Sequence, residues 1–263
     1  MSKPVRELFD LSGRKALVTG GSRGLGRQVA EALGEAGAEV LLTARKGEEL
    51  ESVVESLAKR GVTAHWIAAD ASDPTEVQRV CRHALEQLGT VDILVNNAGA
   101  AWGAPAEDYP LEAWDKVMNL NVRSVFLFSQ YIAKHSMIPR REGRIVMMAS
   151  IAGLAGNGDG SEAVAYNASK AAVINLTRAL AAEWGPFGIA VNAIAPGWFP
   201  SKMTRGTIEA RGIEKMKERI PLRRLGDEND LKGVTLLFAS RAGKHITGQV
   251  LAVDGGVSAV IGG

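Results

Sequence analysis

Two residues in the second half of the chain, Tyr166 and Lys170, could together perform acid–base chemistry. They stand four positions apart in "AYNASKAAV" (165–173), a stretch of good helix formers, so both side chains are expected on one helical face. A free tyrosine has a pKa of about 10, which is too high for ready proton exchange near neutral pH. An ammonium group one turn away favours the phenolate by Coulomb attraction and lowers that pKa. The pair therefore predicts a tyrosine that donates a proton to a substrate oxygen in one direction and accepts it in the other.

Two further polar residues are candidates for supporting roles around this pair. Ser150 closes an expected strand at 143–150 and could hydrogen-bond a substrate oxygen, which would hold the substrate in place. Asn121 lies in an expected long helix from about 111 to 136, where it could anchor a water that connects Lys170 to solvent. We therefore expect a catalytic group made of Asn121, Ser150, Tyr166 and Lys170.

A glycine-rich segment, "TGGSRGLG" (19–26), lies where the first expected strand passes into the first expected helix. Gly20, Gly24 and Gly26 would let the backbone turn sharply and approach a ligand. The helix N-terminus offers free amide groups and the positive end of its dipole to a pyrophosphate. This placement predicts a dinucleotide site, and an ordinary tight turn is the alternative.

The end of the second expected strand bears on which nicotinamide cofactor binds. An acidic residue about 20 positions after the glycine-rich turn would accept the ribose 2′-hydroxyl of NAD. This chain has Ala44, Arg45 and Lys46 there instead. Arg45, together with Arg23, could form charge-assisted hydrogen bonds with a 2′-phosphate, which predicts NADP(H); solvent-exposed surface arginines are the alternative.

The expected secondary structure places these residues at one edge of a sheet. We expect strands at 15–20, 39–44, 63–70, 91–99, 143–150, 189–196 and 248–256, and helices at 24–37, 47–61, 74–88, 111–136 and around Tyr166. Apolar strands that alternate with helices imply a parallel sheet covered on both faces, so the fold class is α/β, a doubly wound single-domain fold. Asp73 before Pro74 predicts a helix start, and Gly37, Gly61 and Gly89 predict helix ends.

Residues 197–227 do not follow this alternation and read as a long, charged, irregular lid. From Lys202 to Arg224 the chain has eight Lys and Arg residues against three Glu, which could attract an anionic substrate such as a phosphopantetheine carrier. A solvated amphipathic surface is the alternative. The apolar candidates for a substrate pocket come from loops that converge at the same sheet edge. They are Trp102, Ile151, Leu154, Trp198, Phe199 and Met203.

Composition limits the classes of function. A chain of 263 residues suits one α/β domain, which we divide into an N-terminal extension at 1–10, the body, and the lid. A net charge of +2 is too small to indicate nucleic-acid binding. The single cysteine, Cys81, excludes an internal disulfide, and the start "MSKPVRELFDLSG" has neither an export signal nor a membrane span, so we expect a cytoplasmic protein. The four histidines have no ligand spacing, so no metal is expected.

The ordered set "TGGSRGLG", "NNAG" (96–99), "MNLNVRSVF" around Asn121, Ser150, "YNASK", "APG" (195–197) and "VDGG" (253–256) resembles the short-chain dehydrogenase/reductase family, in the form that has roughly 250 residues. The resemblance runs from about Leu11 to Val257. It implies a seven-stranded Rossmann sheet, hydride transfer with NAD(P), the four catalytic residues above and a homotetramer. The segment between Ser150 and Tyr166 is a few residues longer than is usual in the family.

The resemblance also implies a set of cofactor contacts. Lys170 is expected to hold the nicotinamide ribose, Asp70 to lie near the adenine, and the backbone after Gly197 to face the nicotinamide carboxamide. Asn97 could also join neighbouring strands through its amide, although turn chemistry alone would explain an asparagine there. The residues expected to contact the cofactor are Gly20, Ser22, Arg23, Gly24, Leu25, Gly26, Arg45, Asp70, Ala71, Asn97, Ala98, Gly99, Tyr166, Lys170, Pro196, Gly197 and Ser201.

The sequence therefore predicts an NADPH-dependent reductase that converts a ketone or a 3-oxoacyl group into a secondary alcohol. The chain is similar to 3-oxoacyl reductases and related carbonyl reductases, and sugar-acid or polyol dehydrogenases of the same family share most of its motifs. An NADP-sensing regulator without catalysis would be expected to lack Tyr166 or Lys170, and this chain has both. The expected partner is a small carbonyl or alcohol substrate, with an acyl thioester as one form of it, and neither nucleic acid nor membrane is expected.

Overall fold

A parallel seven-stranded sheet forms the centre of the protein, in the strand order β3-β2-β1-β4-β5-β6-β7. The computed structural model describes residues 3–156 and 162–260. Its strands are β1 (Lys15–Thr19), β2 (Glu39–Ala44), β3 (Ala64–Ala68), β4 (Ile93–Asn96), β5 (Gly143–Met148), β6 (Ile189–Pro196) and β7 (Val250–Val253). Each expected strand is present, and the predicted single-domain α/β Rossmann fold is confirmed.

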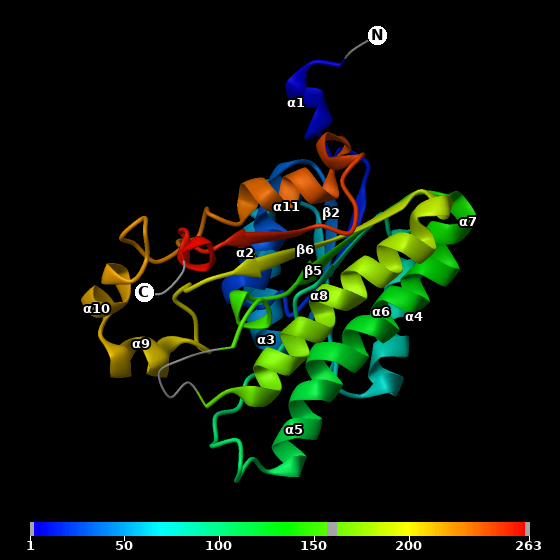
Figure 1. Ribbon diagram of the computed structural model, residues 1–263. Helices are drawn as coiled ribbons and strands as arrows, with labels where there is room; N and C mark the ends of the chain where they lie inside the picture. The colour runs from blue at the N-terminus through cyan, green and yellow to red at the C-terminus, as the bar shows by residue number, and fades with distance from the viewer. Residues whose placement is uncertain (1–2, 157–161, 261–263) are drawn as a thin grey trace.

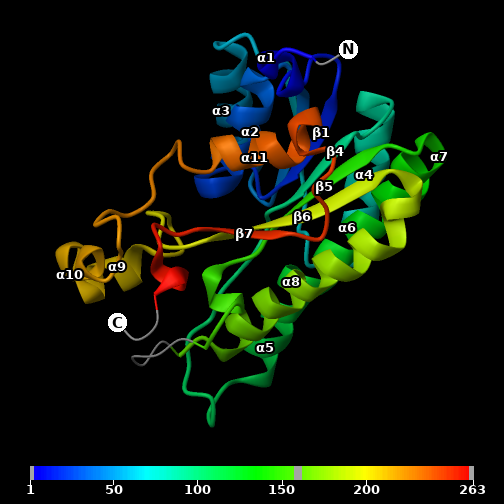
Figure 2. The ribbon, with the colours of Figure 1, turned by 45° about the horizontal axis from the view of Figure 1, so that its top comes forward.

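Helices cover both faces of this sheet (Figures 1 and 2). One face carries α2 (Gly24–Glu35), α3 (Gly47–Ala58) and α11 (Lys232–Ala239), and the other carries α4 (Pro74–Leu88), α6 (Ser124–Ile132) and α8 (Val164–Trp184). Two groups of buried apolar residues fill the layers between helices and sheet. Because water reaches neither face, the central strands read as nearly continuous apolar runs, and β6 is buried along its whole length.

The strand order reverses between β1 and β4, which are hydrogen-bonded neighbours. The register places Leu17 of β1 level with Leu41 of β2 and Leu94 of β4, and all three side chains are fully buried. The chain runs outward from β1 to β3 and then returns to start β4 on the other side of β1. In open parallel sheets, ligands bind beside the carboxyl ends of the strands at this reversal. The carboxyl ends of β1 and β4 are therefore the place to look for a site.

The helix boundaries follow the expected local signals. Asp73 caps α4 by accepting a hydrogen bond from the Thr75 backbone amide at 2.8 Å, and Pro74 occupies the first turn. Gly37, Gly61 and Gly89 have φ angles of 102°, 76° and 75°, so each ends its helix with a backbone conformation that favours glycine. The predictions for these boundaries are confirmed. Cys81 is fully buried on α4, as expected of a small apolar side chain.

The expected long helix over 111–136 is interrupted by two π-helical turns. It consists of α5 (Leu111–Met118), a π-turn at Asn119–Arg123, α6, a second π-turn at Ala133–Met137, and α7 (Ile138–Arg140). Apolar periodicity over this stretch is compatible with a plain α-helix, so the sequence pattern does not predict the insertions. π-Turns occur often at functional sites, and the first of these contains Asn121.

The stretch at 197–227 is more regular than expected, and its description as irregular is wrong. It contains α9 (Arg205–Arg211) and α10 (Ile213–Glu218), joined at Gly212, whose φ angle is 77°. Ile208 and Met216 anchor the two helices because both side chains are buried. Each helix has only two turns or fewer, too short for apolar periodicity to be recognised in a charged sequence. The helix α11 was not predicted from the sequence either.

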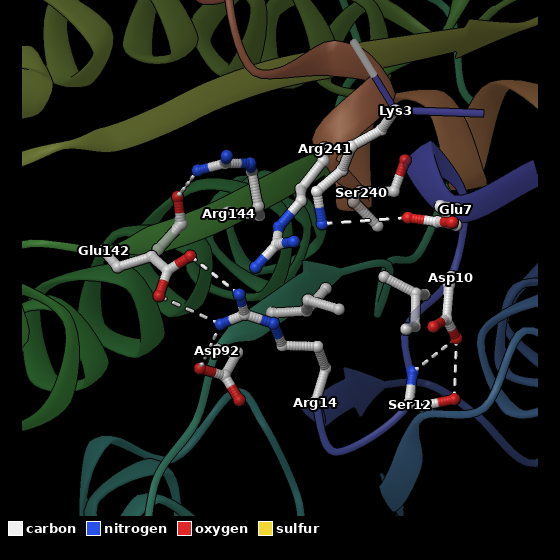
Figure 3. Close-up of a pocket in the computed structure, with 14 residues that line it drawn as sticks. Lys3, Glu7, Asp10, Ser12, Arg14, Asp92, Glu142, Arg144, Ser240 and Arg241 are labelled. Atoms are coloured by element: carbon white, nitrogen blue, oxygen red, sulfur yellow. Dashed lines mark hydrogen bonds and ion pairs between the residues drawn. The ribbon is translucent and has the colours of Figure 1, made fainter. Parts of the chain in front are cut away.

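At the amino ends of the strands, charged side chains surround a small cavity of about 230 Å³ (Figure 3). Arg14 donates to both carboxylate oxygens of Glu142 at 3.0 and 2.8 Å and to Asp92 at 3.3 Å. The short helix α1 (Val5–Leu8), within the expected N-terminal extension, lies close to these strand ends (Figure 1). None of the predicted site residues lines this cavity. The ion pairs of Arg14 with Asp92 and Glu142 connect residues that lie just before β1, β4 and β5.

Within the described part of the chain, no helix combines the length and the apolar character needed to cross a membrane.

Candidate active site

The glycine-rich turn connects β1 to α2 and has no room for side chains at two of its glycines. Gly20 has a φ angle of 67°, and a Cβ there would lie 2.8 Å from the Asn97 side-chain nitrogen. A Cβ at Gly26 would overlap the Gly20 carbonyl and the same nitrogen. Gly24, with a φ angle of 53°, has open space on its Cβ side up to Ser201, whose Cβ lies 3.9 Å away. The turn thus exposes backbone at the start of α2, an arrangement that fits a pyrophosphate.

The end of β4 is joined to the end of β1 directly beside this turn. The Asn97 side chain donates to the carbonyl oxygens of Thr19 at 2.9 Å and Gly20 at 3.1 Å. The backbone amides of Asn97 and Ala98 each donate to the Thr19 hydroxyl at 3.0 Å. The strand-joining amide bonds expected of Asn97 are therefore present. Thr19 was not predicted, although a hydroxyl residue as the last residue of a strand is a usable signal.

A cluster of charged side chains lies beyond the turn, between α2 and α3. The Arg23 guanidinium lies 3.3 Å from the Glu49 carboxylate, and the Lys46 ammonium lies 3.5 Å from it. The Ser22 hydroxyl donates to the same carboxylate at 3.1 Å. Arg45 directly follows β2 and is exposed. Ser22 and Arg23, both expected to contact the cofactor, are thus held together by Glu49, which was not predicted.

Asp70 follows β3 at the same edge. Burial raises the pKa of its carboxyl, but hydrogen bonds from the Ser72 amide and hydroxyl, with the charges of Arg45 and Lys116, bring the pKa below its ordinary value. Ala71 comes next along the chain. The carboxylate is therefore ionised at neutral pH.

Ser150 and Tyr166 meet where β5 ends. Ser150 starts a 3₁₀ turn at Ile151–Gly153, and its hydroxyl accepts from the Ala152 amide at 3.2 Å. This turn packs against the backbone of α8, because a Cβ at Gly153 would lie 2.5 Å from the Lys170 carbonyl carbon. A side-chain hydrogen bond joins Ser150 to Tyr166. The close packing of the turn on α8 is what holds the two hydroxyl groups together.

Lys170 lies one turn along α8 from Tyr166; Lys170 is buried, and Tyr166 is partly buried at the cavity wall. The Lys170 ammonium donates to the Met148 carbonyl at 2.7 Å and lies 5.6 Å from the centre of the Tyr166 ring. Burial lowers the pKa of Lys170 from 10.5 to about 8. Burial raises the pKa of Tyr166, and the hydrogen bond with Ser150 only partly offsets that rise.

The expectation that Lys170 makes the phenol acidic is therefore wrong for the groups this chain supplies. Burial has the larger effect on the pKa of Tyr166, and the group that opposes it is the Ser150 hydroxyl rather than Lys170. The phenol consequently carries its proton at neutral pH, which is the state a proton donor needs.

Asn121 is fully buried, and its side chain ties three parts of the site together. Its amide oxygen accepts from the Ala100 backbone amide, and its amide nitrogen donates to the Ala100 carbonyl, both at 2.8 Å. The same nitrogen donates to the Ser169 hydroxyl at 2.9 Å, and that hydroxyl donates to the Tyr166 carbonyl at 2.7 Å. Both donors of the amide are thus used within the protein, so its side chain positions other residues. Ser169 was not predicted, although it lies inside the "YNASK" motif.

The remaining predicted cofactor residues line the same edge. A Cβ at Gly99 would lie 3.2 Å from the Asn121 amide oxygen and 3.7 Å from the Lys170 ammonium nitrogen, so the loop after β4 passes close to these groups. Leu25 lies in the first turn of α2, and Pro196 is the last residue of β6. Gly197 packs closely against Asp254, since a Cβ added at Gly197 would lie only 2.6 Å from the Cβ of Asp254.

A cavity of about 1220 Å³ opens beside Ser150 and Tyr166, under the lid helices α9 and α10. The predicted pocket residues Trp102, Ile151, Trp198 and Met203 line it.

Two other residues predicted for the pocket, Leu154 and Phe199, lie outside this lining. Leu154 is 44% exposed and lies outside the lining. Phe199 is only 4% exposed and belongs to the core, where a side chain on Gly226 would overlap its ring. Sequence proximity to a lining residue did not distinguish a side chain that faces the cavity from one that faces the core.

Basic side chains from the lid form part of the cavity wall. Arg211, Lys215 and Arg219 line it, together with Glu162 from the opposite side. The Arg211 guanidinium carbon lies 5.5 Å from the centre of the Trp198 ring, within range of a cation–π interaction. The cavity therefore combines apolar and aromatic surface with positive charge. Five residues of the segment between Ser150 and Tyr166, 157–161, lie outside the described residues.

Among the described residues, no three His, Cys, Asp or Glu side chains are grouped so as to hold a metal ion. The prediction that the protein uses no metal stays a prediction.

The chain matches known proteins along nearly its whole length. A family model described as enoyl-(acyl carrier protein) reductase matches residues 20–258. The chain is 39% identical over 260 residues to gluconate 5-dehydrogenase of Gluconobacter oxydans (strain 621H), covering 98% of this chain and 99% of that protein. It is 40% identical over 252 residues to the rhamnolipids biosynthesis 3-oxoacyl-(acyl-carrier-protein) reductase of Pseudomonas aeruginosa, covering 94% and 97%. The crystal structure of a gluconate 5-dehydrogenase from Burkholderia cenocepacia J2315, in complex with NADP and tartrate, superposes with a TM-score of 0.92 at 32% identity, covering 98% of this chain and 100% of that chain.

Proposed function

Because the chain belongs to the short-chain dehydrogenase/reductase family, we propose that it is an NADP(H)-dependent enzyme that reduces a ketone to a secondary alcohol. The observation that carries this proposal is the hydrogen-bonded pair of Ser150 and Tyr166 at the wall of a large cavity. The exposed backbone of the glycine-rich turn lies at the same edge of the sheet. A proton donor, a nucleotide site and a substrate cavity are thus next to one another.

Each catalytic residue has a distinct part in the proposed reaction. Bound NADPH supplies the hydride that reduces the carbonyl carbon. Tyr166, protonated at neutral pH, transfers its phenolic hydrogen to the carbonyl oxygen, which becomes the hydroxyl of the product. Ser150 hydrogen-bonds the same oxygen and orients it toward the phenol. Lys170 is fixed by the Met148 carbonyl and holds the nicotinamide ribose, and Asn121 positions α8.

NADP(H) is the proposed cofactor because the residues that directly follow β2 are cationic and the strand does not end in a carboxylate. Arg45 and Lys46 come at the end of β2, and Arg23 approaches the same place from the glycine-rich turn. Guanidinium groups bind phosphate well through paired hydrogen bonds. The Burkholderia relative with NADP bound supports the same choice.

For the substrate, we favour a 3-oxoacyl thioester of a phosphopantetheine carrier. The apolar surface of Trp102, Ile151 and Met203 suits an acyl chain, and the cavity of about 1220 Å³ exceeds what a simple ketone needs. The lid cations Arg211 and Lys215 at its wall would attract the phosphate of the carrier arm. The 3-oxoacyl reductase of Pseudomonas aeruginosa supports this choice.

A sugar acid is the second candidate, because the same lid cations would also bind a carboxylate. Gluconate 5-dehydrogenase of Gluconobacter oxydans is 39% identical to the chain, and the Burkholderia structure holds the dicarboxylate tartrate. We further propose a homotetramer, as is usual in the family. We also propose a cytoplasmic location, where a lone buried thiol such as Cys81 stays reduced.

The substitution Tyr166→Phe tests the proposed chemistry. Phenylalanine keeps the ring but removes the transferable hydrogen, so the variant should bind NADPH as the wild type does and lose at least about 100-fold in kcat. Tyr131→Phe, on α6, is the matched control and should keep full activity. A Tyr166→Phe enzyme that retains more than a tenth of the wild-type rate would remove Tyr166 from the role of proton donor.

A panel of substrates identifies the class. Acetoacetyl and longer 3-oxoacyl thioesters, 5-ketogluconate, simple ketones and an enoyl thioester are assayed by NADPH consumption, and values of kcat/KM are compared. The proposal expects the 3-oxoacyl thioesters to rank first. A higher value for 5-ketogluconate would select the sugar-acid candidate, and turnover of the enoyl thioester alone would contradict ketone reduction.

A further inference from the structure

The carboxylate of Glu49 lies beside Arg23, which is expected to bind the ribose phosphate. It accepts a hydrogen bond from the Ser22 hydroxyl at 3.1 Å. Its oxygens lie 3.3 and 3.4 Å from the Arg23 guanidinium nitrogen, and the Lys46 ammonium lies 3.5 Å away. One carboxylate thus contacts a hydroxyl, a guanidinium and an ammonium that come from the glycine-rich turn and the end of β2.

The location of Glu49 on α3 favours an anion there. Glu49 is the third residue of α3, so its charge lies near the positive end of the helix dipole. Burial acts to raise the pKa of its carboxyl, but the hydrogen bond from Ser22 and the charges of Arg23 and Lys46 leave that pKa below its ordinary value. Glu49 is therefore ionised at neutral pH. Its side chain is 32% exposed, so a solute that approaches this cluster meets the carboxylate.

A 2′-phosphate would need the same partners that Glu49 already holds. Phosphate oxygens bind best to guanidinium, ammonium and hydroxyl donors, and these are the groups that Glu49 engages. A carboxylate and a phosphate held by the same donors would also repel each other. By contrast, a ribose with a free 2′-hydroxyl can donate a hydrogen bond to a carboxylate.

We propose that Glu49 is a specificity-determining residue, whose carboxylate competes with the 2′-phosphate of NADP(H) for Ser22, Arg23 and Lys46 and thereby keeps NAD(H) usable. This inference rests on the proposed NADP(H) function and deepens it. Arg45 favours the phosphorylated cofactor, and Glu49 limits the size of that preference. The observed ratio between the two cofactors is then the balance of these opposed residues.

Glu49→Gln is the variant that tests this role, because glutamine keeps the shape and loses the charge. Glu48→Gln is the matched control, since Glu48 is the preceding residue of α3 and is exposed. Adenosine 2′,5′-bisphosphate and adenosine 5′-monophosphate are the probes, titrated calorimetrically into each protein, and they differ only in the 2′-phosphate. NADP⁺ and NAD⁺ are titrated in the same way.

The expected result is a change in the ratio of dissociation constants. Loss of one partly exposed charge interaction of about 1 kcal/mol should tighten binding of adenosine 2′,5′-bisphosphate and NADP⁺ about fivefold in Glu49→Gln. Binding of adenosine 5′-monophosphate and NAD⁺ should stay the same or weaken, and Glu48→Gln should match the wild type.

Two contrary outcomes have different meanings. In the first, the wild type prefers adenosine 2′,5′-bisphosphate but Glu49→Gln binds it no more tightly than the wild type does. Glu49 then does not compete with the phosphate and the inference is wrong, while the proposed cofactor stands. If neither the wild type nor Glu49→Gln distinguishes the two probes, the proposed NADP(H) preference is wrong and the inference falls with it.

Discussion

Replacing Lys170 by methionine should make the protein more stable and less active at the same time. The ammonium group is buried, and its one protein hydrogen bond is to the Met148 carbonyl at 2.7 Å among the described residues. Methionine has a similar length and no charge, so it can occupy the same space. The change therefore separates the cost of a buried charge from the benefit of having that charge in the site.

The pKa of Lys170 gives the size of this cost. A lowering from 10.5 to about 8 corresponds to roughly 3 kcal/mol of unfavourable free energy for the charged form in the folded protein. Loss of the hydrogen bond to Met148 costs about 1 kcal/mol in the variant. The net gain expected at pH 7 is about 2 kcal/mol in the free energy of unfolding, or about 4 °C in Tm.

The gain should depend on pH in a defined direction. Between pH 8 and 10.5 the unfolded chain keeps a proton on Lys170 that the folded protein has released, so wild-type stability from this group rises with pH over that window. Below pH 8 the charge is present in both states and the full cost applies. The advantage of Lys170→Met should thus be largest at pH 7 and should vanish near pH 10.

Urea unfolding at pH 7 and pH 9.5 measures these differences through the transition midpoint and slope. Lys244→Met, an exposed lysine, is the control for adding methionine and should change stability little at either pH. NADPH turnover by Lys170→Met should fall at least about 100-fold if the amine is needed for chemistry. An unchanged or lower stability at pH 7, with the same pH dependence as the wild type, would refute the reasoning about the buried charge.

Two further substitutions test the nucleotide site. Arg45→Asp should weaken the binding of NADPH by about tenfold more than the binding of NADH, because a charge-assisted contact with the phosphate is lost. Fluorescence titration measures both dissociation constants. Equal losses for the two cofactors would place Arg45 away from the 2′-phosphate. Its control, Arg82→Asp, changes an exposed charge on α4. Gly26→Ala should lower the free energy of unfolding by about 1–3 kcal/mol and weaken the binding of both cofactors, because its Cβ would overlap the Gly20 carbonyl. Gly233→Ala is the control, since a Cβ there has open space and should leave the stability unchanged. Equal stability of the two variants in thermal or urea unfolding would contradict the close packing at Gly26.

The sheet and its order of elements could be predicted because their signals are local. Apolar runs fix the strands, and residues such as Asp73 and Gly89 fix helix ends through their own backbone chemistry. The convergence of Ser150 and Tyr166 was also predictable, since both lie at carboxyl ends or on helices that follow them. The fold brings such positions to one edge whatever the side chains are.

What could not be predicted depends on contacts between distant segments. The rise in the pKa of Tyr166 comes from burial, which a sequence pattern of four residues does not report. The core location of Phe199 results from packing against Gly226, more than two dozen positions away. The contacts of Glu49 with Ser22 and Arg23 join α3 to the glycine-rich turn, and no spacing rule connects them.

The lid and the catalytic group come from different parts of the fold, and this has a consequence for how the protein could change. Ser150 follows β5 and Tyr166 belongs to α8, whereas the opposite wall of the cavity comes from α9 and α10. Mutations in those two short helices can reshape the cavity without moving the hydroxyl pair. Evolution, or an engineer, could therefore exchange one substrate for another by changing these two helices while the proton-transfer machinery is inherited intact.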